Sequence, residues 1–117
     1  MPVIWHSDGN IEALLPMAID AGFAGVHGLE PGAGMDLARL KREYGRDLTL
    51  VGNVDVRLLG GPELQPVRAD VRRSFAQGSP GGRFMISSCN SIFEGLDPRA
   101  VAEMFRAEAE LGEERIP

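Results

Sequence analysis

Four short apolar runs alternate along this chain with four segments in which apolar residues recur every three or four positions. The runs, each followed by polar residues or glycine, are Val3–Trp5, Phe23–Leu29, Leu48–Gly52 and Phe84–Ser87. Runs of this length without strict alternation are typical of parallel strands that are covered on both faces. The pattern therefore predicts an α/β fold in which four βα units follow one another.

Capping and helix-breaking residues bound the predicted helices. The first helix has the candidate cap Asn10 and ends at Gly22, but Pro16 lies within it. Because a proline beyond the first turn removes a backbone hydrogen bond, we expect this helix to start late or to kink. The second helix is expected to run from the cap Asp36 to the terminator Gly45.

The third and fourth helices are both expected to open with a proline, which suits the first helical position. The third starts at Pro62 and stops before the turn that begins at Gly78, and the fourth starts at Pro98. The residues expected to face inward are Leu64, Val67, Val71 and Phe75 in the third helix, and Val101, Met104 and Phe105 in the fourth.

Composition and charge exclude several classes of protein. With 117 residues, 44% hydrophobic and 25% charged, the chain is long enough for one compact domain. The net charge of -5 and the scattered arginines leave no basic stripe, so we expect neither a nucleic-acid partner nor a membrane partner. Cys89 is the only cysteine, no apolar run approaches the roughly 20 residues of a membrane helix, and the start lacks signal-peptide features. We therefore expect a cytoplasmic protein.

Four βα units fit either a small doubly wound sheet or half of an eight-stranded (βα)8 TIM barrel, whose full length is about 250 residues. Polar side chains follow every predicted strand, and in a parallel barrel all these positions face one mouth. A doubly wound sheet commonly carries a glycine fingerprint in its first turn, and none is present; Gly32 and Gly34 form only a fragment of one, after the second strand. The polar residues after the strands are His6, Asp8, Glu30, Asn53, Asp55, Cys89 and Asn90.

Each candidate site residue also has a purely structural interpretation. His6 and Asp8 can converge for metal binding or proton transfer, or Asp8 can cap a turn while His6 bonds to the backbone. Glu30 is a candidate base, acceptor or ligand, although pairing with an arginine is the commoner fate of such a residue. The alternation of a strand end predicts that Asn53 and Asp55 point the same way, and Asp55 can instead simply brace Arg57.

A histidine and a cysteine complete the candidates. His27 lies inside a strand, where a hydrogen-bonded core histidine is commoner than a ligand, so we leave it out of the site. Cys89 is either a small buried hydrophobe or a soft metal ligand opposite His6. Together with Asp8 these two residues give a mixed nitrogen, oxygen and sulfur set that suits zinc, with a fourth position open to substrate.

Several segments spread over nearly the whole chain carry a family resemblance through their order and spacing. The most specific is Gly52-Asn-Val-Asp55. The others are His6-Ser-Asp-Gly-Asn-Ile, Ala21-Gly22, Glu30-Pro31, Gly34-Met-Asp-Leu, Tyr44-Gly45, Ser88-Cys-Asn-Ser-Ile-Phe and Asp97-Pro98. Together these segments resemble the C-terminal part of the uroporphyrinogen decarboxylase family.

This resemblance implies a (βα)8 barrel with its site at the carboxyl mouth, of which residues 1–117 form a single partial domain, the last four βα units. The family includes porphyrinogen decarboxylases, which need no cofactor, and zinc-dependent methyltransferases that act on methylated corrinoids. After the final strand, the decarboxylases have a segment similar to His-Gly-Leu-Tyr, and this chain has Asn90-Ser-Ile-Phe93 there. The methyltransferases have a His-x-Cys pattern that His6 matches, while Asp8 replaces the first cysteine and Cys89 lies at or beside the second.

We therefore expect a lyase of porphyrin metabolism that decarboxylates a porphyrinogen or a related multi-carboxylate without a cofactor. Its expected catalytic residues are His6, Asp8, Glu30, Asp55 and Asn90. One alternative is a methyltransferase that holds zinc through His6, Asp8 and Cys89 and acts on a corrinoid. Another is an inactive fragment or a binding half-barrel. Because a half-barrel has two open strand edges, we expect a homodimer, pairing with a separate N-terminal half, or aggregation.

Overall fold

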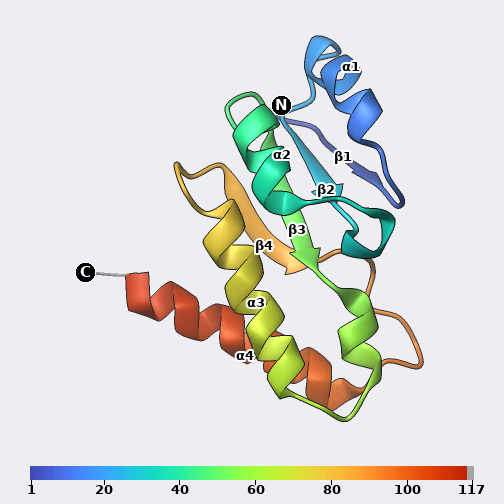
Figure 1. Ribbon diagram of the computed structural model, residues 1–117, viewed down its shortest axis with the longest axis vertical. Helices are drawn as coiled ribbons and strands as arrows, with labels where there is room; N and C mark the ends of the chain where they lie inside the picture. Colours follow the sequence, from blue (N-terminus) through green and yellow to red (C-terminus); the bar gives the residue numbers. More distant parts are fainter. Residues whose placement is uncertain (116–117) are drawn as a thin grey trace.

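Four parallel strands lie side by side in the order in which they occur along the chain (Figure 1). The computed structural model describes residues 1–115. The strands are β1 (Ile4–Ser7), β2 (Gly25–Gly28), β3 (Thr49–Val54) and β4 (Phe84–Ser88). Each pairs in parallel with the next, so that His6 lies level with His27 and Asn53 with Ser87. The predicted α/β fold of four βα units is confirmed, with strand bounds shifted by a few residues.

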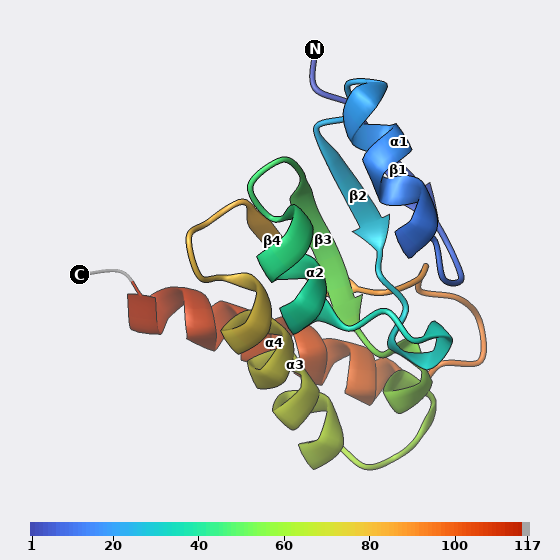
Figure 2. The ribbon, with the colours of Figure 1, turned by 45° about the horizontal axis from the view of Figure 1, so that its top comes forward.

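A helix follows each strand. The helices are α1 (Leu15–Asp20), α2 (Leu37–Tyr44), α3 (Gln65–Gly78) and α4 (Pro98–Arg115), and 3-10 turns precede the first three at Glu12–Leu14, Pro31–Ala33 and Val56–Gly60. Figure 2 shows α1 in front of β1 and α2 in front of β3. Within residues 1–115, no helix has both the length and the apolar character needed to cross a membrane.

The predicted starts at Asp36 and Pro98 are confirmed, and the first helix begins late, as expected, because Pro16 lies in the first turn of α1 after a separate 3-10 turn. The candidate cap Asn10 was wrong for α1: its Oδ1 accepts from the backbone N–H of Glu12, at the preceding 3-10 turn. Asp36 caps α2 by accepting a hydrogen bond from the backbone N–H of Arg39, and α4 begins at Pro98. The prediction for the third helix was wrong: α3 begins at Gln65, and the proline in its first turn is Pro66. Two prolines four residues apart both satisfy the sequence rule, which cannot choose between them.

The core consists of two apolar clusters that meet at β3. One cluster lies between α1, α2 and the first three strands and includes Leu15, Leu40 and Leu50. The other lies between β3, β4, α3 and α4 and includes Val54 and Met104. The sheet therefore buries one face against its own helices.

The opposite face of the sheet is not covered by this chain. Ile4 on β1 and Met85 on β4 point to that face and are 45% and 50% exposed. The expectation that the strands are covered on both faces therefore does not hold within residues 1–115. In a closed (βα)8 barrel this inner face is filled by side chains from strands on the opposite side, and only four strands are present here.

The large apolar side chains that remain exposed lie at the two ends of the sheet as well as on its inner face. Between residues 18 and 84 no large apolar side chain is exposed. Phe105, which we expected to face inward, is 56% exposed, because that side of α4 has no neighbouring helix in this chain. The exposed residues at the ends are Val3, Leu14 and Met17 near β1, and Ile92, Phe93 and Phe105 near β4.

We predict that the isolated chain associates through these ends, as a dimer that closes an eight-stranded ring or as larger species. Size-exclusion chromatography with light scattering at micromolar concentration measures this. Charges introduced by Met17→Lys together with Phe105→Glu should shift the protein toward monomer. Ala76→Glu, on the exposed side of α3, is the matched control and should change nothing. A monodisperse wild-type monomer at micromolar concentration would contradict the prediction.

One carboxyl oxygen on α4, Oε1 of the partly buried residue Glu108, is shielded from solvent without a hydrogen-bond partner among residues 1–115. Burial therefore raises the pKa of Glu108 to about 7, from an ordinary value of 4.5. Glu103 and Glu110 on the same helix, in contrast, are both held by Arg68 of α3.

Glu108 should make stability depend on pH. Between pH 4.5 and 7 the unfolded chain loses this proton while the folded chain keeps it, so the free energy of unfolding falls as the pH rises. Glu108→Gln should remove this fall and raise the free energy of unfolding at pH 8 by about 1–3 kcal/mol, with little effect at pH 4. Urea unfolding at fixed protein concentration tests this. Glu110→Gln breaks an ion pair instead and should not stabilise the protein at pH 8.

Candidate active site at the carboxyl ends of the strands

The carboxyl ends of all four strands lie at one edge of the sheet because the strands are parallel and sequential. The segments that follow them, 8–14, 29–36, 55–64 and 89–97, form what we call the mouth loops. These loops and the last residues of the strands carry every side chain that the sequence proposed for the site. The structure places these side chains in separate small groups rather than in one cluster.

Two histidines form the first group. Nδ1 of His6 lies 2.9 Å from Nδ1 of His27 on the neighbouring strand, with the ring centroids 4.9 Å apart. Nε2 of His27 lies 3.0 Å from Oγ of Ser87 and 3.0 Å from the carbonyl oxygen of Ser88, both on β4. His27 is partly buried and hydrogen-bonded, as we expected, but it belongs to the inner face beside His6.

Asp8 extends this pair toward solvent. Its Oδ1 lies 3.6 Å from Nε2 of His6. The Asp8 side chain is 61% exposed and the His6 side chain 45%. The predicted convergence of His6 and Asp8 is present, at the distance of an ion pair rather than of a hydrogen bond. This nitrogen of His6 is therefore accessible to a ligand and has a carboxylate beside it.

Glu30 joins two mouth loops. Its Oε2 accepts a hydrogen bond of 2.8 Å from the backbone N–H of Gly9. Within residues 1–115, Glu30 forms no ion pair with an arginine, which we had taken as its commoner fate. A glutamate in this position sets the path of the loop that carries Asp8.

Asp55 pairs with Arg57, as one of the two interpretations of the sequence predicted. Oδ2 of Asp55 lies 2.6 Å from Nη2 of Arg57, and Oδ1 accepts from the Arg57 backbone N–H. Its hydrogen bond to the guanidinium of Arg57 lowers the pKa of Asp55. A Cβ added at Gly32 would lie 3.0 Å from Cζ of Arg57, so the guanidinium also lies against the loop after β2. Arg57 is the only lysine or arginine in the mouth loops.

Cys89 is buried behind the mouth. The residue is 1% exposed, and its Sγ accepts a hydrogen bond from the backbone N–H of Val56, 3.4 Å away. Burial is the main cause that raises the pKa of the Cys89 thiol. Asn90, the next residue, is partly exposed, and its Oδ1 accepts from the backbone N–H of Ser91.

These positions do not assemble the zinc set that the sequence suggested. Among residues 1–115 no group of three or more histidine, cysteine, aspartate or glutamate side chains could hold a metal ion. His6 and Asp8 are neighbours, but the Cys89 thiol is buried and bonded to the backbone of the loop after β3. The residues present therefore do not fit zinc in this arrangement, and we derive no step through it.

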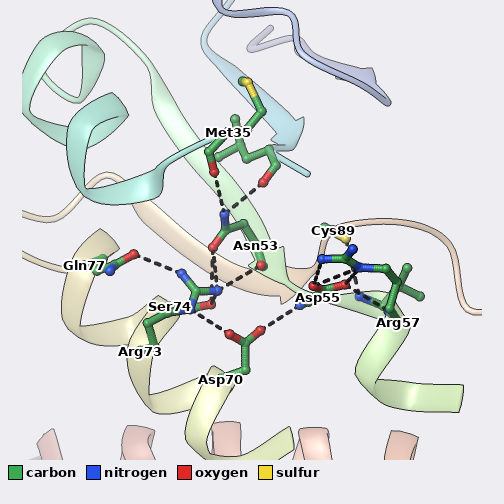
Figure 3. A network of polar contacts seen from close by, with 11 residues as sticks. Met35, Asn53, Asp55, Arg57, Asp70, Arg73, Ser74, Gln77 and Cys89 are labelled. Atoms are coloured by element: carbon green, nitrogen blue, oxygen red, sulfur yellow. Dashed lines mark hydrogen bonds and ion pairs between the residues drawn. The ribbon is translucent and has the colours of Figure 1, made fainter. Parts of the chain in front are cut away.

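Asn53, at the end of β3, does not share the direction of Asp55, contrary to the strand alternation that we assumed (Figure 3). Its buried side-chain amide donates to the carbonyl oxygens of Leu29 and Met35, at 2.8 and 3.5 Å. Its Oδ1 accepts from Nη2 of Arg73, at 3.1 Å, and from Oγ of Ser74 on α3. A buried amide must satisfy its donors and its acceptor, and these partners lie on the helix side.

The Asn53 network also reaches the mouth. Arg73 bonds to Oδ1 of Asp70, and Oδ2 of Asp70 accepts from the backbone N–H of Asp55, 2.8 Å away. Figure 3 shows Asp70 between Arg73 and the start of the loop after β3. Helix α3 thereby sets the position of Asp55 and of its partner Arg57.

Sequence reasoning missed the roles of His27 and Ser87. One signal was available for His27: Val26 belongs to the core on the helix side, so strict alternation places His27 on the opposite, inner face. The approach of Ser87 has no local signal, because it depends on the register of strands that are distant in sequence.

The fold and the position of these residues define four consecutive βα units of a (βα)8 barrel with a polar mouth at the carboxyl ends of its strands. The sequence pattern of the uroporphyrinogen decarboxylase (URO-D) family matches residues 1–111, and the chain belongs to this family.

Among solved structures, a methyltransferase from Methanosarcina mazei is similar, with a TM-score of 0.77 and 24% sequence identity. The match covers 95% of this chain and 32% of that chain, so the present chain spans about a third of it. At this identity the likeness shows the fold. No curated protein matches.

The burial of Cys89 predicts a protected thiol. A thiol reagent such as dithionitrobenzoate should label the native chain at least about 100-fold more slowly than the chain unfolded in urea, because the reactive species is the thiolate and burial disfavours it. Labelling is followed by absorbance at pH 8. Rapid stoichiometric labelling without denaturant would contradict the buried position and would return Cys89 to the list of accessible ligands.

Proposed function

We propose that this chain contributes the last four βα units of a decarboxylase-like enzyme, a lyase acting on a porphyrinogen or a related multi-carboxylate without a cofactor. The observation that carries the proposal is the family match over residues 1–111, with a histidine and carboxylates gathered at the carboxyl ends of the strands. The activity itself belongs to a barrel that is about three times as long as this chain, judged from the similar methyltransferase.

Decarboxylation of a pyrrole acetate has two electrostatic requirements. Protonation of the ring carbon produces a cation, and the C–C bond to the carboxylate then breaks, releasing carbon dioxide while its electron pair neutralises the ring. The site must therefore hold a proton near that carbon and place negative charge near the cation. His6, with Asp8 beside its exposed Nε2, is the proton-holding group in this half.

The mouth loops have an excess of acidic residues, which suits the second requirement. They contain one basic residue, Arg57, against eight acidic residues. Three of these eight form ion pairs with arginines, Glu12 with Arg39, Asp55 with Arg57 and Asp97 with Arg99. Negative charge of this kind stabilises a cation on the pyrrole nitrogens and repels the carboxylates of the substrate. The acidic residues are Asp8, Glu12, Glu30, Asp36, Asp55, Glu63, Glu94 and Asp97.

A multi-carboxylate substrate therefore needs cationic anchors beyond those of this half. Arg57 is exposed but already paired with Asp55. Asn90 stands at the position where the decarboxylases carry a histidine. Its Oδ1 accepts a hydrogen bond from the Ser91 N–H, so its side-chain NH2 group is what it can offer to a ligand. The remaining anchors are assigned by this proposal to the other βα units of the barrel.

Two alternatives make different demands. A corrinoid methyltransferase needs a metal held by several ligands, and His6, Asp8 and Cys89 are not assembled for one within residues 1–115. A binding half-barrel needs only the apolar ends and the inner face. Neither alternative accounts for the acidic mouth as directly as cation stabilisation does.

The test uses the chain joined in frame to the coding sequence upstream of Met1, or supplied in trans with the first half of a barrel of this family. Chemically reduced uroporphyrinogen is incubated anaerobically, and products are separated by chromatography after oxidation. We expect loss of carboxyl groups, and His6→Ala should lower kcat by about 10²- to 10⁴-fold, the usual contribution of a general acid or base.

Glu43→Gln, an exposed change on α2 outside the mouth loops, is the matched control and should retain activity. Absence of carboxyl loss from the completed barrel would refute the proposal. Equimolar zinc in the purified protein, lost in the double variant His6→Ala with Cys89→Ala, would favour the methyltransferase alternative.

A further inference from the structure

The contacts of His27 determine where its proton lies. Its Nε2 is 3.0 Å from the carbonyl oxygen of Ser88, which can only accept a hydrogen bond. Nε2 must therefore carry a hydrogen. The hydroxyl of Ser87, also 3.0 Å away, fits the same assignment, since it can accept from Nε2 while donating to the Ser88 carbonyl. A neutral His27 ring with its hydrogen on Nε2 has a bare Nδ1.

This assignment propagates to His6. Its Nδ1 faces the bare Nδ1 of His27 at 2.9 Å, so His6 must donate from that nitrogen. If a neutral His6 carried its hydrogen on Nε2 instead, the lone pairs of the two Nδ1 atoms would face each other. A neutral His6 then has its lone pair on Nε2, the nitrogen that is exposed at the mouth and lies 3.6 Å from Asp8.

The sheet leaves room for the hydrogen bonds that join His27 on β2 to Ser87 and Ser88 on β4. His27 reaches across β3, where Gly52 has no side chain and Asn53 turns toward α3. A Cβ added at Gly52 would lie 2.6 Å from the carbonyl oxygen of Gly28, so the two strands approach closely at this level. The residues around His27 thus hold its ring in one orientation.

We propose that His27 is a positioning residue that fixes His6 in the tautomer with Nδ1–H, and so presents the Nε2 lone pair of His6 to a ligand in the mouth. The role in catalysis rests on the proposed function; the tautomer does not. A ligand that donates a hydrogen bond to Nε2 lies beside Asp8 and leaves both hydrogen bonds of His27 unchanged. The His6 ring is therefore preorganised to accept a hydrogen bond at the mouth.

The tautomer is directly observable because the chain contains only two histidines. Long-range ¹H–¹⁵N NMR spectra of the ¹⁵N-histidine-labelled 117-residue chain, recorded at alkaline pH, distinguish the two neutral forms. We expect Nδ1–H for His6 and Nε2–H for His27. A wild-type spectrum with His6 in the Nε2–H form would overturn the proposal whatever the variants do.

Two variants separate positioning from mere packing. His27→Asn places its amide where Nδ1 of His27 was and keeps an acceptor for His6, so the Nδ1–H form should persist. His27→Gln places its amide near the former Nε2 and removes that acceptor, so His6 should shift toward the Nε2–H form. An unchanged tautomer in His27→Gln would overturn the proposal.

In the completed barrel, His27→Gln should lower kcat by about 10- to 100-fold, the usual effect of losing a group that orients a functional histidine, and His27→Asn should recover most of it. Equal activity of wild type and His27→Gln in an active enzyme would overturn the positioning role. A completed barrel without decarboxylase activity, whose spectra still show the expected tautomers, would overturn the proposed function and support the assignment of His27.

Discussion

A parallel sheet has to bury both of its faces, and the helices of this chain cover only one. The other face carries Ile4 and Met85 into solvent, and apolar side chains remain exposed at both ends of the sheet. The strands point the same way, so the uncovered face and the polar mouth meet along one rim. The polar side chains suited to chemistry therefore lie beside the uncovered face of the sheet.

In the proposed function, the charge around the mouth divides the roles between the two halves of the completed barrel. This half contributes a histidine pair, carboxylates and, in its mouth loops, a single arginine that is paired with Asp55. Such a set stabilises positive charge but repels an anionic substrate. The proposed reaction has to bind several carboxylates and also stabilise a cationic intermediate, and the proposal meets these opposite demands by assigning the cationic anchors to the other half.

Local patterns predicted the order of strands and helices, the cap at Asp36 and the gathering of polar residues at one edge, because these depend on periodicity and on residues close in sequence. The direction of Asn53 depends on partners in distant segments, and no local signal encodes it. Strand alternation places His27 on the inner face, but its pairing with His6 depends on the register between two strands. The inward assignment of Phe105 failed for a related reason: the apolar stripe of α4 is broader than its contact with this chain's own sheet.

The division of the core into two clusters has a consequence for cooperativity. Strand β3 contributes fully buried side chains to both clusters, Leu50 to one and Val54 to the other, and β4 adds the partly buried Phe84 and Ile86 in the same way. The Asn53 network bonds the loop after β2 to α3. Each half of the domain is thus a βαβα unit with an interior of its own. We therefore expect native-state amide hydrogen exchange to report two opening units, coupled through the strands that both clusters share and through the buried Asn53 carboxamide.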